Sequence, residues 1–431
     1  MTDHTKRPVR DFAVDFYRVL GVILIVLGHW LAAAVTYDDG HFGRENPLLD
    51  QPWTQYLTWI FQAVPVFFLV AGYAAAVSWA HRRDTDGFSR QAWLRHRLAR
   101  VLGPTAVYLG LVSVVVVALD VSGVAGSALE YAGWALAMQL WFLAIYLVVV
   151  SLTPIAVAAH NRWGLLAPGA LVVGAVAIDV AAVGCQVPYI GWLNYVLCWG
   201  TLYQLGIAWH ERLLTGSKPM LIAAGSALTL ALLIWLGPYP VSMIRVAGQP
   251  VHNTTPPTVA LLAFGCAQTG LAMTVAPAVN RALRSRRVQR VISVANANVM
   301  ALYLWHLVPV VIVAIVGYPA GLFPHPVEGT GAWWLFRLEW VVILSLVTAV
   351  EMAVLWWRRR LFAAPLPLVD VPFSERRAEP ILLAGAAMAT YGLAFFAAKG
   401  FAPAGHFPWV SALVFAVGVV LVALRPTRVS G

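Results

Sequence analysis

The stretch VDFYRVLGVILIVLGHWLAAAV, residues 14–35, decides the fold class of this chain. It is long enough to cross a bilayer as an α-helix, which needs about 20 mainly apolar residues. Asp15 lies near its start, and Arg18 and His29 lie inside it. At about 100° per residue, the eleven steps between them make three turns plus about 20°, so both side chains lie on one helix face. Ionisable groups at this depth usually face a bundle interior or a wet cavity, and the pair therefore indicates a functional path.

The rest of the chain has the composition of an integral membrane protein. It has 431 residues, 60% hydrophobic and 11% charged, and a mean hydropathy of +0.75. Soluble domains carry about 25% charged residues. Hydropathy predicts an all-α fold, a polytopic transmembrane helical bundle of about 12 spans. The predicted spans are 14–35, 56–80, 101–120, 131–153, 165–184, 191–209, 219–237, 258–279, 292–316, 334–357, 381–399 and 408–424.

The net charge of +10 follows this topology. With the N-terminus inside, all but five of the 29 Lys and Arg residues fall in cytoplasmic segments, as the positive-inside rule requires. We therefore expect cytoplasmic N- and C-termini, a lipid bilayer as partner and no nucleic acid. The five exceptions are Arg18, Arg44, Arg245, Arg337 and Lys399.

Two histidines, His29 and His306, lie deep in predicted spans. Both spans run outward and each histidine lies about fifteen residues past the start of its span, so we expect both at one depth in the outer half of the membrane. Histidine titrates near neutrality, which suits removal of a proton from a hydroxyl. Asp179 or Glu339 could orient one of them. The alternative is that each histidine is a hydrogen-bonded packing residue.

Three arginines are candidates for binding an anion. Arg97 and Arg100, in the sequence RHRLARVLGP, share one helix face at the entrance to the third span. Arginine is the preferred bidentate partner of phosphate, and Arg18 could also hold one. The alternatives are interfacial snorkelling for Arg97 and Arg100 and a local ion pair between Asp15 and Arg18.

These motifs resemble those of the acyltransferase-3 family of membrane acyltransferases. The first helix has the family's R-x10-H pair at Arg18 and His29, and Ala71 stands where the second-helix pattern FFxxSGY has its serine. The matching segments are DFYRVLGVILIVLGHW (15–30), VPVFFLVAGY (64–73), RLAR (97–100, the family's RxxR), LWFL (140–143) and YLWH (303–306).

The resemblance implies a ten-span acyltransferase core over 11–360. A proline-rich, charged cytoplasmic linker (361–380) and two additional transmembrane helices with a tail (381–431) follow it. The family moves acyl groups, commonly acetyl, from cytoplasmic acyl-CoA to hydroxyls of envelope glycolipids or glycans in the bacterial plasma membrane. No metal is expected. The bias toward Ala, Val and Arg resembles actinobacterial members, such as the trehalose mycolate acetyltransferases.

The resemblance also implies roles for the candidate residues. Arg18, Arg97 and Arg100 would bind the phosphates of acyl-CoA, and His29 would remove the acceptor hydroxyl proton, directly or by way of an acyl-enzyme. His306 would polarise the thioester carbonyl or position the acceptor. The alternative function is a transporter or flippase of an anionic lipid or glycolipid, in which His29 relays protons.

Overall fold

A computed structural model describes residues 10–83 and 88–427, and helices dominate it. The predicted all-α fold class is confirmed. In the described residues the named strands form only two small sheets, the antiparallel pair β1 (Val35–Asp38) and β2 (His41–Arg44) and the parallel pair β3 (Val369–Val371) and β4 (Leu424–Pro426).

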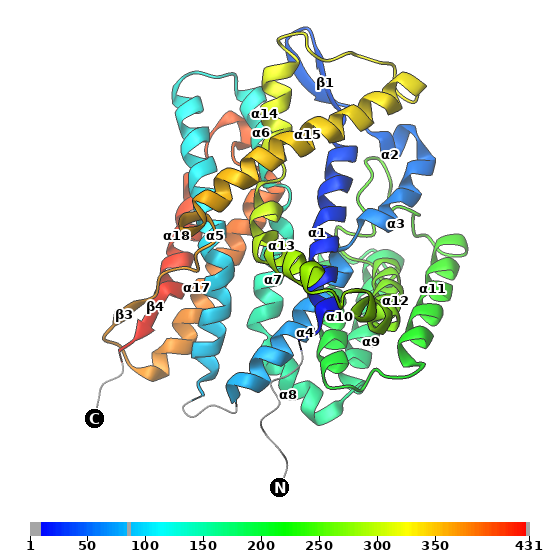
Figure 1. The fold of residues 1–431 in the computed structure, drawn as a ribbon, viewed down its shortest axis with the longest axis vertical. Helices are drawn as coiled ribbons and strands as arrows, with labels where there is room; N and C mark the ends of the chain where they lie inside the picture. Colours follow the sequence, from blue (N-terminus) through cyan, green and yellow to red (C-terminus); the bar gives the residue numbers. More distant parts are fainter. Residues whose placement is uncertain (1–9, 84–87, 428–431) are drawn as a thin grey trace. The chain divides into compact units, whose positions relative to one another are not determined.

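The chain divides into two compact units. Figure 1 labels many of the helices that compose them. Unit 1 comprises Met1–Ile25, Ile60–Val77 and Ala159–Val299, and unit 2 comprises Val26–Trp59, Ser78–Ala158 and Met300–Gly431. Five helices contribute residues to both units: α1 (Phe12–Ala32), α3 (Thr58–Phe61), α4 (Val64–Arg83), α8 (Thr153–Trp163) and α13 (Arg286–Trp305).

The other helices belong to one unit each. Those of unit 1 are α9 (Leu166–Asp179), η2 (Val180–Gly184), η3 (Ile190–Leu193), α10 (Asn194–His210), α11 (Lys218–Trp235) and α12 (Val259–Ala282). Those of unit 2 are α2 (Pro47–Asp50), η1 (Pro52–Leu57), α5 (Arg90–Val121), α6 (Gly126–Ala137), α7 (Leu140–Ser151), α14 (Val308–Gly317), α15 (Gly331–Trp357), α16 (Arg359–Phe362), α17 (Glu375–Lys399), η4 (Pro403–Gly405) and α18 (Trp409–Ala423).

Nine helical segments in the described residues are long and apolar enough to cross a membrane, or ten if the bent pair α13 and α14 counts as one span. This confirms a multi-pass membrane protein but not the predicted count of twelve. The two remaining predicted spans correspond to α10, of 17 residues, and α18, of 15 residues. Both are shorter than the length of about 20 residues that spans a typical bilayer.

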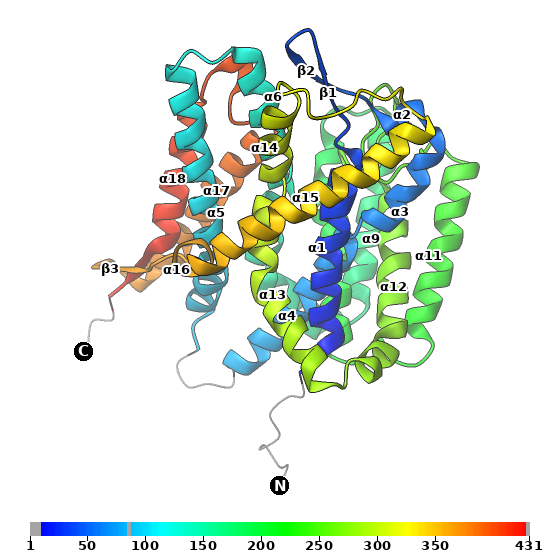
Figure 2. The same ribbon diagram turned by 45° about the horizontal axis from the view of Figure 1, so that its top comes forward.

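In unit 1, α12 packs against α9, α10 and α11, and α9 also packs against α10; α9, α11 and α12 are labelled in Figure 2. The contact between α4 and α10 depends on two glycines. A Cβ on Gly72 would lie 1.9 Å from the carbonyl oxygen of Tyr203, and one on Gly206 would lie 2.0 Å from that of Leu69. The two backbones therefore approach as closely as small-residue interfaces allow in membrane helices. The glycine of the VPVFFLVAGY motif has this packing role.

We expect Gly206→Ala to destabilise unit 1 because the added methyl group overlaps backbone atoms that cannot move aside. Overpacking of this kind costs about 1–3 kcal/mol or more. Gly200→Ala on the same helix is the control, since its Cβ would meet only Leu171 at an ordinary distance of 3.6 Å. Thermal unfolding in detergent should show a lower midpoint for Gly206→Ala alone. Equal midpoints for the two variants would contradict the packing argument.

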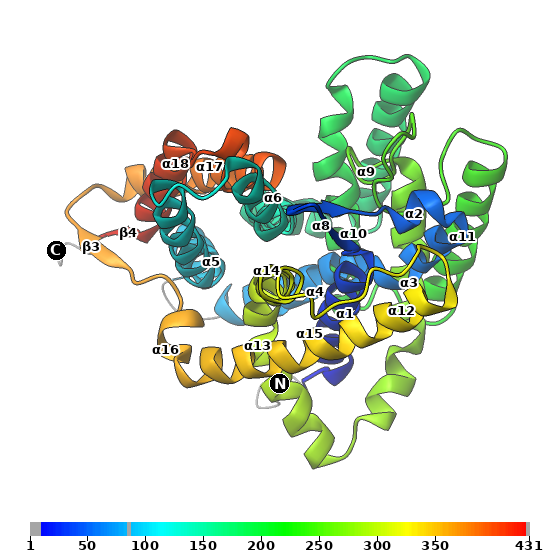
Figure 3. The ribbon, with the colours of Figure 1, turned by 90° about the horizontal axis from the view of Figure 1, so that it is seen from above.

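In unit 2, the last two long helices pack against the helices of the third and fourth predicted spans. α17 contacts α5, α6 and α7, and α18 contacts α5 (Figure 3). Glycines allow two close approaches here. A Cβ on Gly133, in α6, would lie 3.0 Å from the amide nitrogen of Ala402, which follows α17, and one on Gly418, in α18, would lie 2.5 Å from that of Ala389 in α17. The division into a core, a linker and an additional pair stays a prediction, and the pair is firmly packed within unit 2.

Candidate functional site

The two deep histidines meet in unit 2. Nδ1 of His29, in the last turns of α1, lies 2.8 Å from Nε2 of His306, and their rings stack with centroids 5.1 Å apart. His306 is fully buried, with 0% of its surface exposed, whereas His29 is partly exposed. His29 is therefore the more exposed of the two histidines.

A break in the helix positions His306. It lies between the end of α13 and the start of α14, whose first turn contains Pro309. Proline has no N–H to donate and stops the hydrogen-bonding pattern of a preceding helix. At this break, the carbonyl of His306 accepts a hydrogen bond of 2.8 Å from Nε1 of Trp30, the residue after His29. The Trp30–His306 hydrogen bond thus connects the two histidine-bearing segments in addition to the hydrogen bond between the histidine rings.

The hydrogen-bond partners determine which nitrogens carry protons when both rings are neutral. Nδ1 of His306 lies 2.8 Å from the carbonyl oxygen of Tyr303, which can only accept, so this nitrogen must donate. Its Nε2 then has a lone pair and accepts from Nδ1 of His29. Nε2 of His29 consequently holds the free lone pair, which is the state that a general base needs.

A buried polar network holds the segment that carries His306. Tyr303 donates from its hydroxyl to the carbonyl of Gln139 at 2.6 Å. Gln139 donates from Nε2 to the carbonyl of Leu304 at 3.2 Å and to the hydroxyl of Tyr108 at 3.0 Å. Tyr108, Gln139 and Leu304 are fully buried. These hydrogen bonds restrain the segment, because buried groups would lose their partners if it moved. Oε1 of Gln139 is buried and has no hydrogen-bond partner among the described residues.

Arg337, on α15, holds the end of α1. Its guanidinium donates to the carbonyls of Trp30, Leu31 and Ala33 at 3.2, 3.0 and 2.7 Å. A cation here satisfies carbonyls that a helix C-terminus leaves free and complements the helix dipole. Arg337 is only 3% exposed and acts on the turn that follows His29.

Arg97 and Arg100 line one cavity of about 150 Å³ in unit 2. Among the described residues, all its charged and titratable lining groups are basic. The guanidinium of Arg97 lies over the ring of Trp93, whose Nε1 donates to Ser78 at 3.1 Å. The cavity is thus suited to an anion. Its lining residues are Ser78, His81, Arg82, Trp93, His96, Arg97 and Arg100.

Arg18 lies in the part of α1 that belongs to unit 1. Its Nη1 donates to Oδ1 of Asn296 at 3.4 Å, and Nδ2 of Asn296 donates to Asp15 at 2.9 Å. Arg10 also binds the Asp15 carboxylate, at 2.6 Å. The Asp15 carboxylate therefore binds Arg10 and Asn296, in addition to any pairing with Arg18 that the sequence suggests. Asn296 bridges Asp15 and Arg18.

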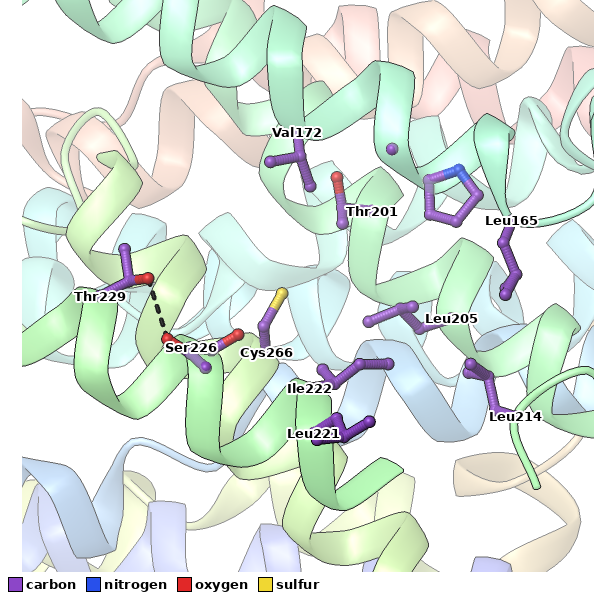
Figure 4. Close-up of a pocket in the computed structure, with 13 residues that line it drawn as sticks. Leu165, Val172, Thr201, Leu205, Leu214, Leu221, Ile222, Ser226, Thr229 and Cys266 are labelled. Atoms are coloured by element: carbon purple, nitrogen blue, oxygen red, sulfur yellow. Dashed lines mark hydrogen bonds between the residues drawn. The ribbon is translucent and has the colours of Figure 1, made fainter. Parts of the chain in front are cut away.

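A larger cavity of about 340 Å³ lies in unit 1 and is mainly apolar (Figure 4). Two of its hydroxyls, those of Thr201 and Thr229, donate to carbonyls of their own helices, at 2.7 and 2.9 Å. Cys266 is the one titratable residue in its lining, so no lining side chain offers a positive charge to an anionic donor. Its lining residues are Leu165, Pro168, Gly169, Val172, Thr201, Leu205, Leu214, Leu221, Ile222, Gly225, Ser226, Thr229 and Cys266.

The structure thus brings together His29 and His306, and separately Arg97 and Arg100. The orienting group of His306 is a main-chain carbonyl, rather than the carboxylate of Asp179 or Glu339. Asp179 accepts from Tyr239 and from the first amide of α12 in unit 1. Sequence reasoning assigned no supporting role to five residues that hold the histidine-bearing segments. Their common signal is a polar side chain inside an apolar span; they are Trp30, Tyr108, Gln139, Tyr303 and Arg337.

A multi-pass helical fold that pairs two histidines deep in its helices fits the class of multi-pass membrane enzymes. A family model described as an acyltransferase domain matches residues 11–356. The chain belongs to this acyltransferase-3 family, and is thereby a membrane acyltransferase. No curated protein and no solved structure matches it. Within the described residues, no group of three or more His, Cys, Asp and Glu side chains could hold a metal ion.

Proposed function

We propose that the chain is an O-acyltransferase of a bacterial plasma membrane. It moves an acyl group, most simply acetyl, from cytoplasmic acyl-CoA to a hydroxyl of an envelope glycolipid or glycan. The observation that carries the proposal is the chain of hydrogen bonds from Tyr303 through His306 to His29, since it leaves a lone pair on Nε2 of His29, the more exposed of the two histidines.

In the proposed reaction, Nε2 of His29 takes the proton of the acceptor hydroxyl. The hydroxyl oxygen attacks the thioester carbonyl carbon, the carbon–sulfur bond breaks, and the acyl group forms an ester. The proton on His29 then passes to the departing thiolate of coenzyme A. General-base catalysis of this kind contributes about 10²–10⁴-fold in rate.

We place the phosphates of the donor in the basic cavity of Arg97 and Arg100. Each guanidinium can donate two parallel hydrogen bonds to two oxygens of a phosphate. Arg82, on α4, lines the same cavity and would add a third cation. The family's R-x10-H motif also makes Arg18 a candidate phosphate-binding residue. On the positive-inside rule, the basic cavity faces the cytoplasm, where acyl-CoA is available.

We assign His306 a positioning role, because it is fully buried and both of its ring nitrogens are engaged. His306→Ala should lower kcat by about 10–100-fold, as loss of an orienting partner typically does, and leave the KM for acyl-CoA unchanged. His306→Gln should retain more activity, because its amide oxygen can accept from His29 in place of Nε2. Steady-state kinetics would contradict the role if the alanine variant were fully active or the glutamine variant no better.

One measurement tests the proposed function as a whole. Purified protein in detergent should consume acetyl-CoA or a longer acyl-CoA when supplied with an envelope lipid extract, and the reaction should need no membrane gradient. Comparative lipid mass spectrometry of a deletion strain should then show which lipid lacks an acyl increment. Transport of an unmodified lipid between two compartments, without acyl-CoA consumption, would overturn the proposal.

A further inference from the structure

The helix that carries Arg97 and Arg100 is weak directly after them. Pro104 lies inside α5 and has no N–H, so the carbonyl of Arg100 loses its partner within the helix. Gly103 precedes it and costs a helix about 0.5–1 kcal/mol relative to alanine. This turn would not by itself hold the two arginines in a defined position.

A segment beyond the family match docks on that turn. The backbone N–H of Leu366 donates to the carbonyl of Ala99 at 2.8 Å. The approach requires glycine at 103, since a Cβ there would lie 2.3 Å from the carbonyl oxygen of Ala364 and 2.5 Å from the nitrogen of Leu366. The linker therefore binds α5 one residue away from Arg100.

The helix that follows the linker holds the first turns of α5. The buried Arg95 donates from Nη2 to the carbonyl of Ala378, on α17, at 3.3 Å. Side chains of the two helices also meet nearer the α5 N-terminus. These contacts are Gln91 to Glu375 and Arg90 to Glu379, each at 2.6 Å.

The docking contacts and the cavity use different faces of α5. At about 100° per residue, the centres of the two faces lie about 130° apart. The contacts can therefore hold the helix without filling the cavity. The docking face comprises Gln91, Arg95, Ala99 and Gly103, and the cavity face comprises Trp93, His96, Arg97 and Arg100.

We propose that the C-terminal extension, residues 364–379, is a splint that positions the donor-binding arginines. It contacts both the first turn of α5 and the weakened turn at Gly103, and so fixes the positions of the Arg97 and Arg100 guanidinium groups. The proposal rests on the proposed function, because it takes the basic cavity as the acyl-CoA site. It gives the additional helices a role in donor affinity, apart from any contact with acyl-CoA.

The test compares two substitutions on the same helix in the full-length protein. Gly103→Leu should displace the linker, whereas Gly110→Leu adds a side chain where a Cβ meets nothing within 4 Å. We expect Gly103→Leu to raise the KM for acyl-CoA and its Kd by roughly 2- to 30-fold, the range seen for mutations that act through coupling. The kcat at saturating donor should be unchanged, and Gly110→Leu should match wild type throughout.

A surface variant covers the case in which Gly103→Leu does not fold. Glu379→Arg should raise the KM for acyl-CoA by placing two arginines together, and adding Arg90→Glu should restore it. Unchanged donor affinity in folded Gly103→Leu, or in Glu379→Arg if Gly103→Leu does not fold, would overturn the splint. If wild-type protein binds no acyl-CoA at all, the proposed function fails instead, so the two failures are distinguishable.

Discussion

Replacing His29 by alanine should lower acyl transfer by about 10²–10⁴-fold, the usual effect of losing a general base. Acyl-CoA affinity should stay near that of wild type, because we place the donor phosphates at Arg97 and Arg100. The fold should also persist, since the end of α1 is held independently by Arg337. Turnover and donor binding would be measured on the same purified sample.

His325→Ala is the matched control for this experiment. His325 lies on an exposed loop of unit 2, where Nε2 contacts the carbonyl of Tyr37 at 3.1 Å. Its replacement should leave turnover unchanged. Near-normal turnover of folded His29→Ala would remove His29 from the reaction, and weakened donor binding in that variant would place the donor differently from our proposal.

The second large effect is expected at the donor site. Hydrogen bonds to charged groups contribute about 1.5–3 kcal/mol, so Arg97→Ala and Arg100→Ala should each weaken acyl-CoA binding by roughly tenfold or more. The loss relative to wild type should be larger at low ionic strength, where the phosphate contact is least screened. Lysine should restore binding only in part, because it lacks the planar pair of donors. Titration calorimetry at two salt concentrations measures all of these effects.

Arg286→Ala provides the comparison for a loss of positive charge alone. Arg286 is exposed at the start of α13, in a basic run that fits the positive-inside rule, and its removal should not change donor affinity. If Arg286→Ala weakens binding as much as Arg97→Ala, the effect is one of general charge. If neither Arg97→Ala nor Arg100→Ala weakens binding, the basic cavity is not the donor site.

Much of the architecture could be predicted from local sequence. Apolar runs indicated the helical membrane fold, and the spacing of Arg97 and Arg100 placed them on one helix face, where the structure finds them lining one cavity. The span count could not be predicted as well. Hydropathy does not sense where a helix ends, and α18 is shorter than its apolar run suggested.

The sequence by itself placed Arg18, His29 and His306 within apolar spans. It also marked them as functional candidates, because an ionisable side chain in a span is costly however the helices pack. Only the tertiary structure decided what His29 can do. Its partner is 277 positions away, and their contact depends on the helix break at Pro309 and on the carbonyl of Tyr303. The proton positions in both rings follow from these neighbours, since the tautomer of an imidazole is set by the hydrogen bonds around it.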